Sequence, residues 1–323
     1  MEQDHPSSSS LTHLDSSGRV SMVDVGGKAI TVRSATAFGI ARVGRDALSR
    51  LIEGGVAKGD AFAAARIAGI MGAKKTSELI PLTHPLGLDL VQIFIAPWRE
   101  DRIVVFGEAR TSGRTGVEME AMTAVSVALL TLYDMLKAVT KGIVIETVRL
   151  LRKTGGKSGD WSGNGVGIVR VEKLATSPGK GTPKLPVDEA MLRVKHGLEG
   201  DAHAADWHRQ VSLLGVESIA KMQAKGLKVD FGSFAENIAT SGVELYKLPI
   251  GSLMAGGDGV VLEVTQIGKE CHSHCAVYHQ AGDCVMPREG IFAQVLAGGR
   301  LITGDRLIII EQKEDVPSQV VHV

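Results

Sequence analysis

The spacing of hydrophobic and polar positions predicts strands and helices in alternation over the first half of the chain. Apolar side chains recur every second residue in β-branched stretches, and every third or fourth residue in Ala- and Leu-rich stretches. Strands are predicted at residues 29–43, 89–98, 101–111 and 142–151, and helices at 45–55, 60–79 and 116–140. This order favours an α+β fold of the ferredoxin-like kind, with the helices on one face of an antiparallel sheet.

The second half has a different pattern, in which short β-branched runs are separated by glycines. Strands are predicted at residues 258–268 and 305–311, and helices only at 216–226 and 289–299. Many short strands with few helices are typical of a sandwich or a barrel. We therefore expect a β-rich, barrel-like second domain.

Composition places the domain boundaries near these changes of pattern. Residues 1–18 are Ser-rich and are expected to form a disordered tail before a first domain at 19–160. A Gly-rich linker is expected at 161–167, a second domain at 168–312 and a C-terminal tail at 313–323. The length of 323 residues fits two domains that can each bury a core.

Charge and composition exclude several classes of protein. The 36 Lys and Arg residues balance 36 Asp and Glu residues, and only 4% of the residues are aromatic, which argues against a nucleic-acid partner. Charged residues interrupt every apolar stretch long enough to span a membrane, and the N-terminal residues are not those of a signal peptide. The 3 Cys residues lie close together near the end of the chain, which is typical of a local site in a reducing compartment. We expect a cytoplasmic protein without a nucleic-acid or membrane partner.

Four residues of the first half carry groups suited to catalysis or anion binding. Lys58 precedes a predicted helix start, where it could hold a phosphate together with free backbone N–H groups; the alternative is a solvated turn. His84 lies between prolines, and a rigid imidazole suits proton transfer unless it is merely packed in its loop. Glu118 and Glu120 begin the long helix, where carboxylates also simply complement the helix dipole.

Asp134 and Lys137 lie one turn apart near the end of the long helix and share a face. The simplest interpretation is a surface ion pair, but the flanking residues are apolar, so we expect a partly buried pair that acts as an acid–base unit. Glu120 is about 21 Å from Asp134 along a helix. If both ends serve one site, that site must combine two subunits related by a two-fold axis.

The motifs KGD, HPL, TGVEMEA and YDMLKA closely resemble the cyclic pyranopterin monophosphate synthase (MoaC) family of molybdenum cofactor biosynthesis. The resemblance covers residues 11–161 almost without gaps. It implies a lyase that converts (8S)-3′,8-cyclo-7,8-dihydroguanosine 5′-triphosphate, a nucleotide-derived small molecule, into cyclic pyranopterin monophosphate and diphosphate without a metal or redox cofactor. It also implies a homo-oligomer, a hexamer of dimers, with sites at subunit contacts.

The same resemblance implies roles for individual residues. The family's catalytic residues fall on Asp134, Lys137 and Lys58. Its substrate-binding positions, which include basic residues suited to a triphosphate, fall on Leu82, Thr83, His84, Glu118, Met119, Glu120, Lys28, Arg33, Lys74 and Lys157. Thr83 stands where many members of the family have Cys.

The second half resembles the MOSC domain over residues 166–311, in stretches such as HGLEGDAH and GDCVMPREG. The resemblance implies a β-rich barrel that handles sulfur, as a persulfide, or binds a molybdopterin-type ligand, and its characteristic thiol falls on Cys271. The residues leave two alternatives open: a metal site within CHSHCAVYHQAGDC, and cysteines with only a structural role. The spacing is not that of a zinc finger, so no metal is expected.

We therefore expect a bifunctional protein of cofactor biosynthesis, a lyase joined to a MOSC domain. The alternative is a catalytically inactive nucleotide-binding scaffold that carries the MOSC domain as a sulfur-carrier or binding module. The presence of Lys58, His84, Glu120, Asp134 and Lys137 favours the enzyme. A third interpretation, a MOSC enzyme that acts on N-hydroxylated bases, requires molybdenum cofactor on the second half.

Overall fold

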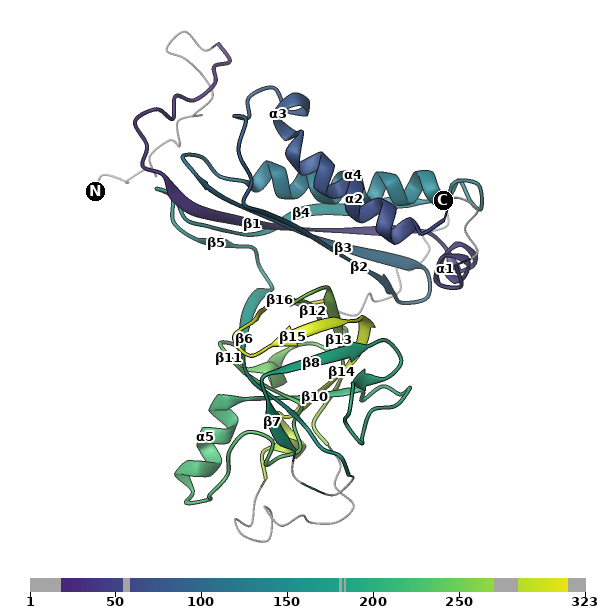
Figure 1. Ribbon diagram of the computed structural model, residues 1–323, viewed down its shortest axis with the longest axis vertical. Coiled ribbons are helices and arrows are strands. Elements are labelled where there is room, and N and C mark those ends of the chain that lie inside the picture. Colours follow the sequence, from purple (N-terminus) through teal and green to yellow (C-terminus); the bar gives the residue numbers. More distant parts are fainter. Residues whose placement is uncertain (1–18, 55–58, 180–181, 183, 270–283, 313–323) are drawn as a thin grey trace, which may run out of the picture.

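A computed structural model describes residues 19–54, 59–179, 182, 184–269 and 284–312 of the chain. An α+β domain comes first, and a β-barrel follows it and lies against the sheet of the first domain (Figure 1). The two domain types agree with those that the hydrophobic pattern predicts.

The first domain is a five-stranded antiparallel sheet with helices on one face. The strand order is β2-β3-β1-β4-β5, and its first four strands have the order of a ferredoxin-like sheet, so that expectation is confirmed. The strands are β1 (Thr31–Arg42), β2 (Leu90–Trp98), β3 (Arg102–Gly113), β4 (Val144–Thr154) and β5 (Trp161–Ser162), and the helices are α1 (Arg45–Ile52), α2 (Ala61–Lys74), α3 (Thr76–Leu79) and α4 (Glu118–Leu136).

Helix α4 forms the centre of this domain's core. Its side chains Leu129, Leu132 and Leu136 are fully buried, and the small residues of β1 leave room for the helix. Gly39 of β1 is required there, because a Cβ would lie 2.6 Å from Leu129 Cδ1 and 2.7 Å from Val125 Cγ1. By length and hydropathy α4 could cross a membrane, but 56% of its apolar window is buried, as in the core helix of a soluble protein.

The second domain is a closed barrel of seven strands. The strands follow one another in the order β11-β10-β14-β13-β12-β16-β6, and β11 pairs with β6 to close the barrel. A strand β7 extends along β6, and β15, β8 and β9 form a small separate sheet. The elements are β6 (Val166–Thr176), β7 (Leu185–Val187), β8 (Glu189–Arg193), β9 (Gly197–Leu198), β10 (Val211–Gly215), α5 (Val216–Ala224), β11 (Ile238–Ser241), η1 (Leu245–Lys247), β12 (Leu253–Gly256), β13 (Val260–Ile267), α7 (Met286–Glu289), β14 (Ile291–Ala297), β15 (Gly299–Ile302) and β16 (Arg306–Ile310).

Two expectations from the sequence differ from the structure. The helix predicted at 289–299 is wrong, because this segment forms β14, which pairs with both β10 and β13 in the barrel wall. The segment 161–167, expected as a linker, begins with β5 paired to β4 and ends within β6. The short stretch between β5 and β6 is the covalent connection between the two domains.

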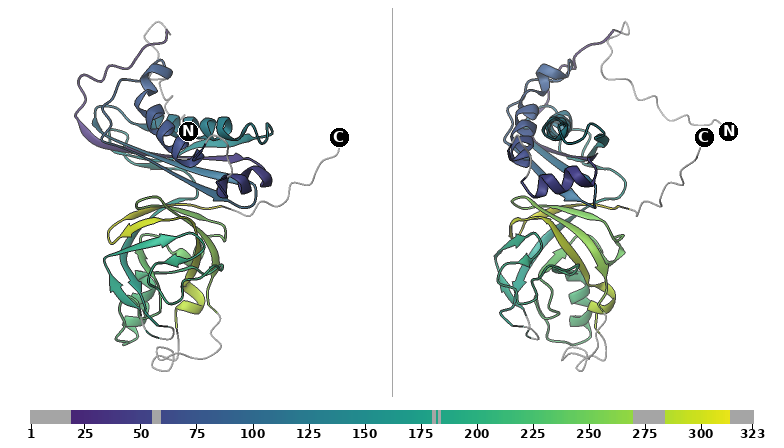
Figure 2. Two further views of the ribbon diagram at one scale, coloured as in Figure 1. Left: turned by 45° about the vertical axis from the view of Figure 1, so that its right-hand side comes forward. Right: turned by 90° about the vertical axis from the view of Figure 1, so that its right-hand side faces the viewer.

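An apolar seam joins the barrel to the face of the sheet that the helices leave open (Figure 2). Strand β2 contacts β13 and β14 across this seam. The buried side chains of the seam are all at most 7% exposed. The sheet contributes Phe38, Phe94, Ala96, Trp98, Val104, Phe106 and Leu151, and the barrel contributes Leu253, Ala255, Val261 and Ile310. Side chains of a strand alternate between the two faces, so each sheet face of the first domain has its own core.

Candidate functional site

A pocket of about 410 Å³ lies where the first turn of α4 meets the loop that follows α3. It brings together residues that are far apart in the sequence, and most of the predicted substrate-binding residues line it. These are Lys28, Leu82, Thr83, His84, Glu118, Met119 and Glu120. The structure therefore gathers seven of the residues that the resemblance assigns to substrate.

Two carboxylates form the acidic wall of this pocket. Glu118 folds back over Gly116, where any Cβ would lie 1.8 Å from Glu118 Oε2, so only glycine allows this arrangement. Lys153 Nζ lies 3.7 Å from Glu118 Oε1 and partly neutralises it. The sequence did not identify Lys153 as a site residue, because only the folded sheet brings the end of β4 beside α4.

Glu120 is the more deeply buried of the two carboxylates, with 4% of its surface exposed. Burial raises the pKa of Glu120 above its ordinary value, and the neighbouring Glu118 carboxylate raises it further. A carboxyl group with a raised pKa keeps its proton to a higher pH than an exposed carboxyl group does. Glu120 is thus suited to donate or accept a proton from a bound ligand.

His84 is presented to the pocket by a fixed turn. The Thr83 hydroxyl donates to the Ile80 carbonyl at 2.9 Å, and the Thr83 backbone N–H donates to the same carbonyl. His84 itself is half-buried. The turn thus fixes the backbone next to His84, whose imidazole lines the pocket.

A glycine-rich loop after β4 packs against Arg33, one of the predicted basic residues. Gly155 and Gly156 both have a φ of +81°, and a Cβ on Gly156 would lie 2.1 Å from Arg33 Nη1. Arg33 donates through Nε to the Gly113 carbonyl at 3.0 Å, close to the pocket-lining Gly116. Lys157 is exposed within the same loop.

Asp134 and Lys137 lie at the other end of α4, on the surface. Their side chains form an ion pair of 2.6 Å and are 55% and 52% exposed, so the expectation of a partly buried pair is wrong for the single chain. The helix buries its Leu132 and Leu136 side, and the pair projects from the opposite side. Hydrogen bonding to Asp134 raises the pKa of Lys137, which therefore stays protonated.

Three further predicted site residues remain to be placed. Lys74 is exposed in the last turn of α2 and does not line it. Lys58 and Cys271 lie outside the described residues.

Comparison with known proteins supplies the family. The sequence model of the MoaC family matches residues 22–156. The cyclic pyranopterin monophosphate synthase of Novosphingobium aromaticivorans is 58% identical over 151 residues, which are 47% of this chain and 96% of the relative. The chain belongs to the MoaC family. Its first domain, called the synthase domain below, is a lyase domain of that family, as the sequence predicted.

The second domain is a MOSC domain, since the model of that domain matches residues 199–308. Two solved structures each match 46% of this chain. YuaD from Bacillus subtilis is 18% identical and covers 46% of this chain and 98% of its own, with a TM-score of 0.40. YiiM from Geobacillus stearothermophilus is 17% identical and covers 46% of this chain and 77% of its own, with a TM-score of 0.36.

A buried charge cluster lies within the MOSC domain. Lys184 Nζ and Asp201 Oδ2 are 2.6 Å apart, and both side chains are 2% exposed. Asn237 and the backbone N–H groups of Ser177 and His203 also donate to Asp201. Burial acts to raise the pKa of Asp201, but the bond from Lys184 and the backbone donors together lower it below its ordinary value.

Asp201 and His203 lie in the loop that follows β9. Asp201 is a buried anion with four donors, and its partner Lys184 could not be identified from the sequence pattern. His203 Nδ1 is buried and lies 3.4 Å from Asp201 Oδ1. Within the described ranges, no three His, Cys, Asp or Glu side chains gather as metal ligands.

Proposed function

We propose that the synthase domain converts (8S)-3′,8-cyclo-7,8-dihydroguanosine 5′-triphosphate into cyclic pyranopterin monophosphate and diphosphate. The observation that supports this most is the single pocket in which Lys28, His84 and the carboxylates of Glu118 and Glu120 meet. The 58% identical relative carries the name of this synthase. We expect the reaction to take place in the cytoplasm.

The substrate's charge and the bonds that change determine what the residues must do. Lys28 lines the pocket, and Arg33 donates to Gly113 close to the pocket-lining Gly116, so that cations are available for the triphosphate. In forming the cyclic phosphate, a substrate hydroxyl attacks the phosphorus nearest the sugar, the bond from that phosphorus to diphosphate breaks, and the hydroxyl proton passes to a base. Glu120 and His84 line the pocket and are suited to such proton transfers.

We propose that a second copy of the chain brings its Asp134 and Lys137 to this pocket. Within one chain these residues lie about 21 Å along α4 from Glu120. Leu130 is 58% exposed one turn before Asp134 on the same side of the helix, and this apolar surface suits coverage by a partner. The hexamer that the resemblance implies would add a further contact between such dimers.

Turnover of the purified full-length protein tests the reaction. We expect cyclic pyranopterin monophosphate and diphosphate from the parent chain, and a loss of about 10²-fold or more in kcat for Asp134→Asn and Lys137→Ala. Glu78→Gln, which alters an exposed carboxylate elsewhere, should leave turnover unchanged. A folded parent protein that binds the nucleotide without converting it would contradict the proposal and support the scaffold interpretation.

Mixing two inactive variants tests the shared site. In a dimer of one Asp134→Asn chain and one Glu120→Gln chain, one site carries both changes and the other carries neither. An equal mixture that exchanges subunits should therefore regain about a quarter of the parent activity. If the mixture stays inactive while mass spectrometry detects mixed dimers, each site is built from one chain.

We also propose that the MOSC domain binds the anionic part of a molybdopterin-type ligand or carries sulfur on Cys271. A cationic neighbourhood around Asp201 supports this: His203 Nδ1 lies 3.4 Å from Asp201 Oδ1, and Lys269 acts on both Lys184 and His203. These side chains are suited to hold a phosphate. The metal or sulfur chemistry would be supplied by the molybdopterin-type ligand or the persulfide.

Purified full-length protein tests this second function. We expect cyanide-releasable sulfur or co-purifying molybdenum in the parent chain, lost in Cys271→Ser and kept in Cys284→Ser, since Cys284 is buried. Parent protein that carries neither sulfur nor molybdenum would contradict the proposal. Equimolar zinc in place of both would favour the metal-site alternative.

A further inference from the structure

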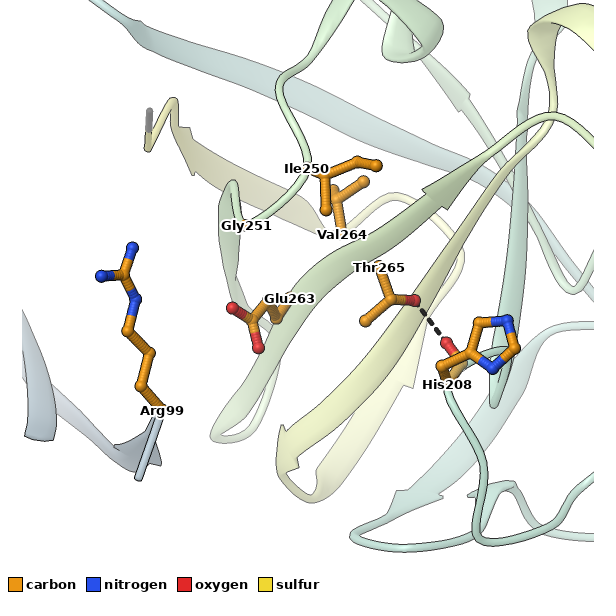
Figure 3. A pocket seen from close by; sticks show the side chains of 7 residues that line it. All are labelled: Arg99, His208, Ile250, Gly251, Glu263, Val264 and Thr265. Carbon is orange, nitrogen blue, oxygen red and sulfur yellow. Dashed lines mark hydrogen bonds between the residues drawn. The ribbon is translucent and has the colours of Figure 1, made fainter. Parts of the chain in front are cut away.

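A second pocket, of about 520 Å³, lies between the two domains and belongs to neither site described above (Figure 3). Arg99 contributes to it from the synthase domain, at the tip of the hairpin between β2 and β3. The barrel contributes the rest of the lining, chiefly Glu263, Thr265, His208 and the aliphatic side chains of Ile250 and Val264. In Figure 3 the charged ends of Arg99 and Glu263 lie on the same side of the barrel wall, one from each domain.

Glu263 is a carboxylate held at the edge of the apolar seam. One of its oxygens, Oε1, accepts a hydrogen bond from the Trp98 indole N–H at 3.1 Å. That is its one hydrogen bond within the described part of the chain, and the carboxylate also faces the pocket. Burial raises the pKa of Glu263, and the Trp98 hydrogen bond and the Arg99 charge partly offset that shift.

Arg99 is held in an unusual backbone conformation beside this carboxylate. Its φ is 55°, in the left-handed region that non-glycine residues seldom adopt. Its guanidinium lies 4.3 Å from the centre of the Trp98 ring, so the cation is stacked and its direction is fixed. A left-handed residue is common at the tip of a hairpin, and here it directs Arg99 back over Trp98, which links Arg99 to the carboxylate.

The pair of groups determines the chemistry that a ligand must have. A carboxylate only accepts hydrogen bonds and a guanidinium only donates them, so the ligand must offer donors beside acceptors. The edge of guanine has this arrangement: its O6 and N7 atoms accept, and the adjacent ring N–H and amino group donate. A pterin ring presents the same carbonyl, ring N–H and amino group in sequence.

We propose that the pocket between the domains binds a guanine-type heterocycle, with its donor edge on Glu263, its carbonyl oxygen on Arg99 and its ring face on Ile250 and Val264. The ligand is a guanine nucleoside or a pterin, which share this edge. This proposal rests on the groups that line the pocket and does not depend on the reaction proposed for the synthase domain. Adenine is excluded from this mode because its ring acceptor N1 would face the carboxylate.

Calorimetric titration of the full-length protein tests the proposal with three uncharged probes: guanosine, neopterin and adenosine. We expect guanosine or neopterin to bind about tenfold or more tightly than adenosine. The tighter of the two identifies the source of the ligand. No heat with either guanosine or neopterin, or equal affinity for adenosine, overturns the proposal.

Two variants locate the binding. Glu263→Gln keeps an oxygen for Trp98 but turns a donor toward the ligand, so guanosine affinity should fall about tenfold and the preference over adenosine should vanish. Arg99→Gly tolerates the left-handed φ and should weaken both guanosine and neopterin. The control Glu189→Gln, on the exposed side of the small sheet, should change nothing.

A third variant separates this pocket from the synthase pocket. Glu120→Gln should leave guanosine binding unchanged. If Glu120→Gln abolishes that binding while Glu263→Gln does not, the nucleoside occupies the synthase pocket and the proposal is wrong. If Arg99 and Glu263 serve only to join the domains, Glu263→Gln will change the melting temperature but not the ratio of the guanosine and adenosine affinities.

Discussion

Glu120 is a carboxyl group that the fold holds almost out of water at the first turn of α4. Its pKa is raised above the ordinary 4.5, first by burial and then by Glu118. An acid with a raised pKa in the folded state stabilises that state below its ordinary pKa. The contribution is lost as the pH rises through the folded value, so ionised Glu120 lowers the stability at neutral pH. Such a cost is typical of a residue kept for function.

The variant Glu120→Gln should therefore be more stable than the parent chain and inactive. We expect a higher melting temperature at about pH 8, where the unfolded chain ionises this acid freely and burial disfavours the anion in the folded chain, and little change at about pH 3, where the acid is protonated in both states. Thermal unfolding at the two pH values measures this. An equal shift at both values would mean that the change acts through packing and not through charge.

Single residues of the synthase pocket were predictable only in part. The residues at 82–84 and 118–120 were identified through the motifs that carry them, and the fold brings both segments to one pocket. Lys153 and the pocket-lining Val23 and Val25 were not identified, because their place depends on how strand ends meet. The burial expected for Asp134 was wrong, since apolar neighbours along the chain lie on other sides of the helix.

The contact between α4 and β1 shows how one element depends on the smallest residue of another. Gly39 faces Val125 and Leu129, and the backbone oxygen of Thr147 would lie 3.1 Å from an added Cβ. The strand cannot yield freely, since β1 is paired on both sides, with β3 and β4. The close approach fixes the distance between α4 and the sheet, and α4 carries functional residues at both ends.

The variant Gly39→Ala should consequently loosen the packing of α4. We expect the free energy of unfolding to fall by about 1–3 kcal/mol, the usual range for an overpacked core. Denaturant unfolding measures the loss. Gly142→Ala is the matched control, because an added Cβ there meets its nearest atom at 3.6 Å, an ordinary contact. Equal stability of the two variants would show that the helix can move away from the sheet without cost.

Elements were easier to predict than residues wherever one face is clearly apolar. The order of strands and helices in the synthase domain followed from periodicity, as did α5, β13 and β16 of the barrel. The failure at 289–299 has a physical reason. This stretch is buried on both faces at Ile291, Phe292 and Ala293, so it lacks the alternation that distinguishes a strand from a helix.

At the scale of the whole molecule, the seam makes the two domains one cooperative unit. Interfaces between domains of a chain are usually polar enough to allow relative motion. This one contains aromatic side chains from the sheet, among them Phe38 and Phe106 at 4.9 Å between ring centres, set against aliphatic side chains of the barrel. Neither domain could expose its side of the seam to water without losing stability.

Calorimetry of the full-length protein should therefore show a single unfolding transition. Val261→Asp would place a charge within the seam, at a cost of about 3–5 kcal/mol, and should separate the transition into two. Ile302→Asp is the control, since Ile302 is 39% exposed on the small sheet of the barrel. Two transitions in the parent chain would show that the domains unfold independently despite the seam.

The seam also bears on how such a fusion can change through evolution. Once Trp98, Phe106 and their neighbours are covered, substitutions that enlarge them or remove polar groups around them carry no penalty in solubility. A later split of the gene would release two proteins that each carry an adhesive apolar face. The joined form thus becomes hard to reverse, and selection must keep both halves even if only one of them confers an advantage.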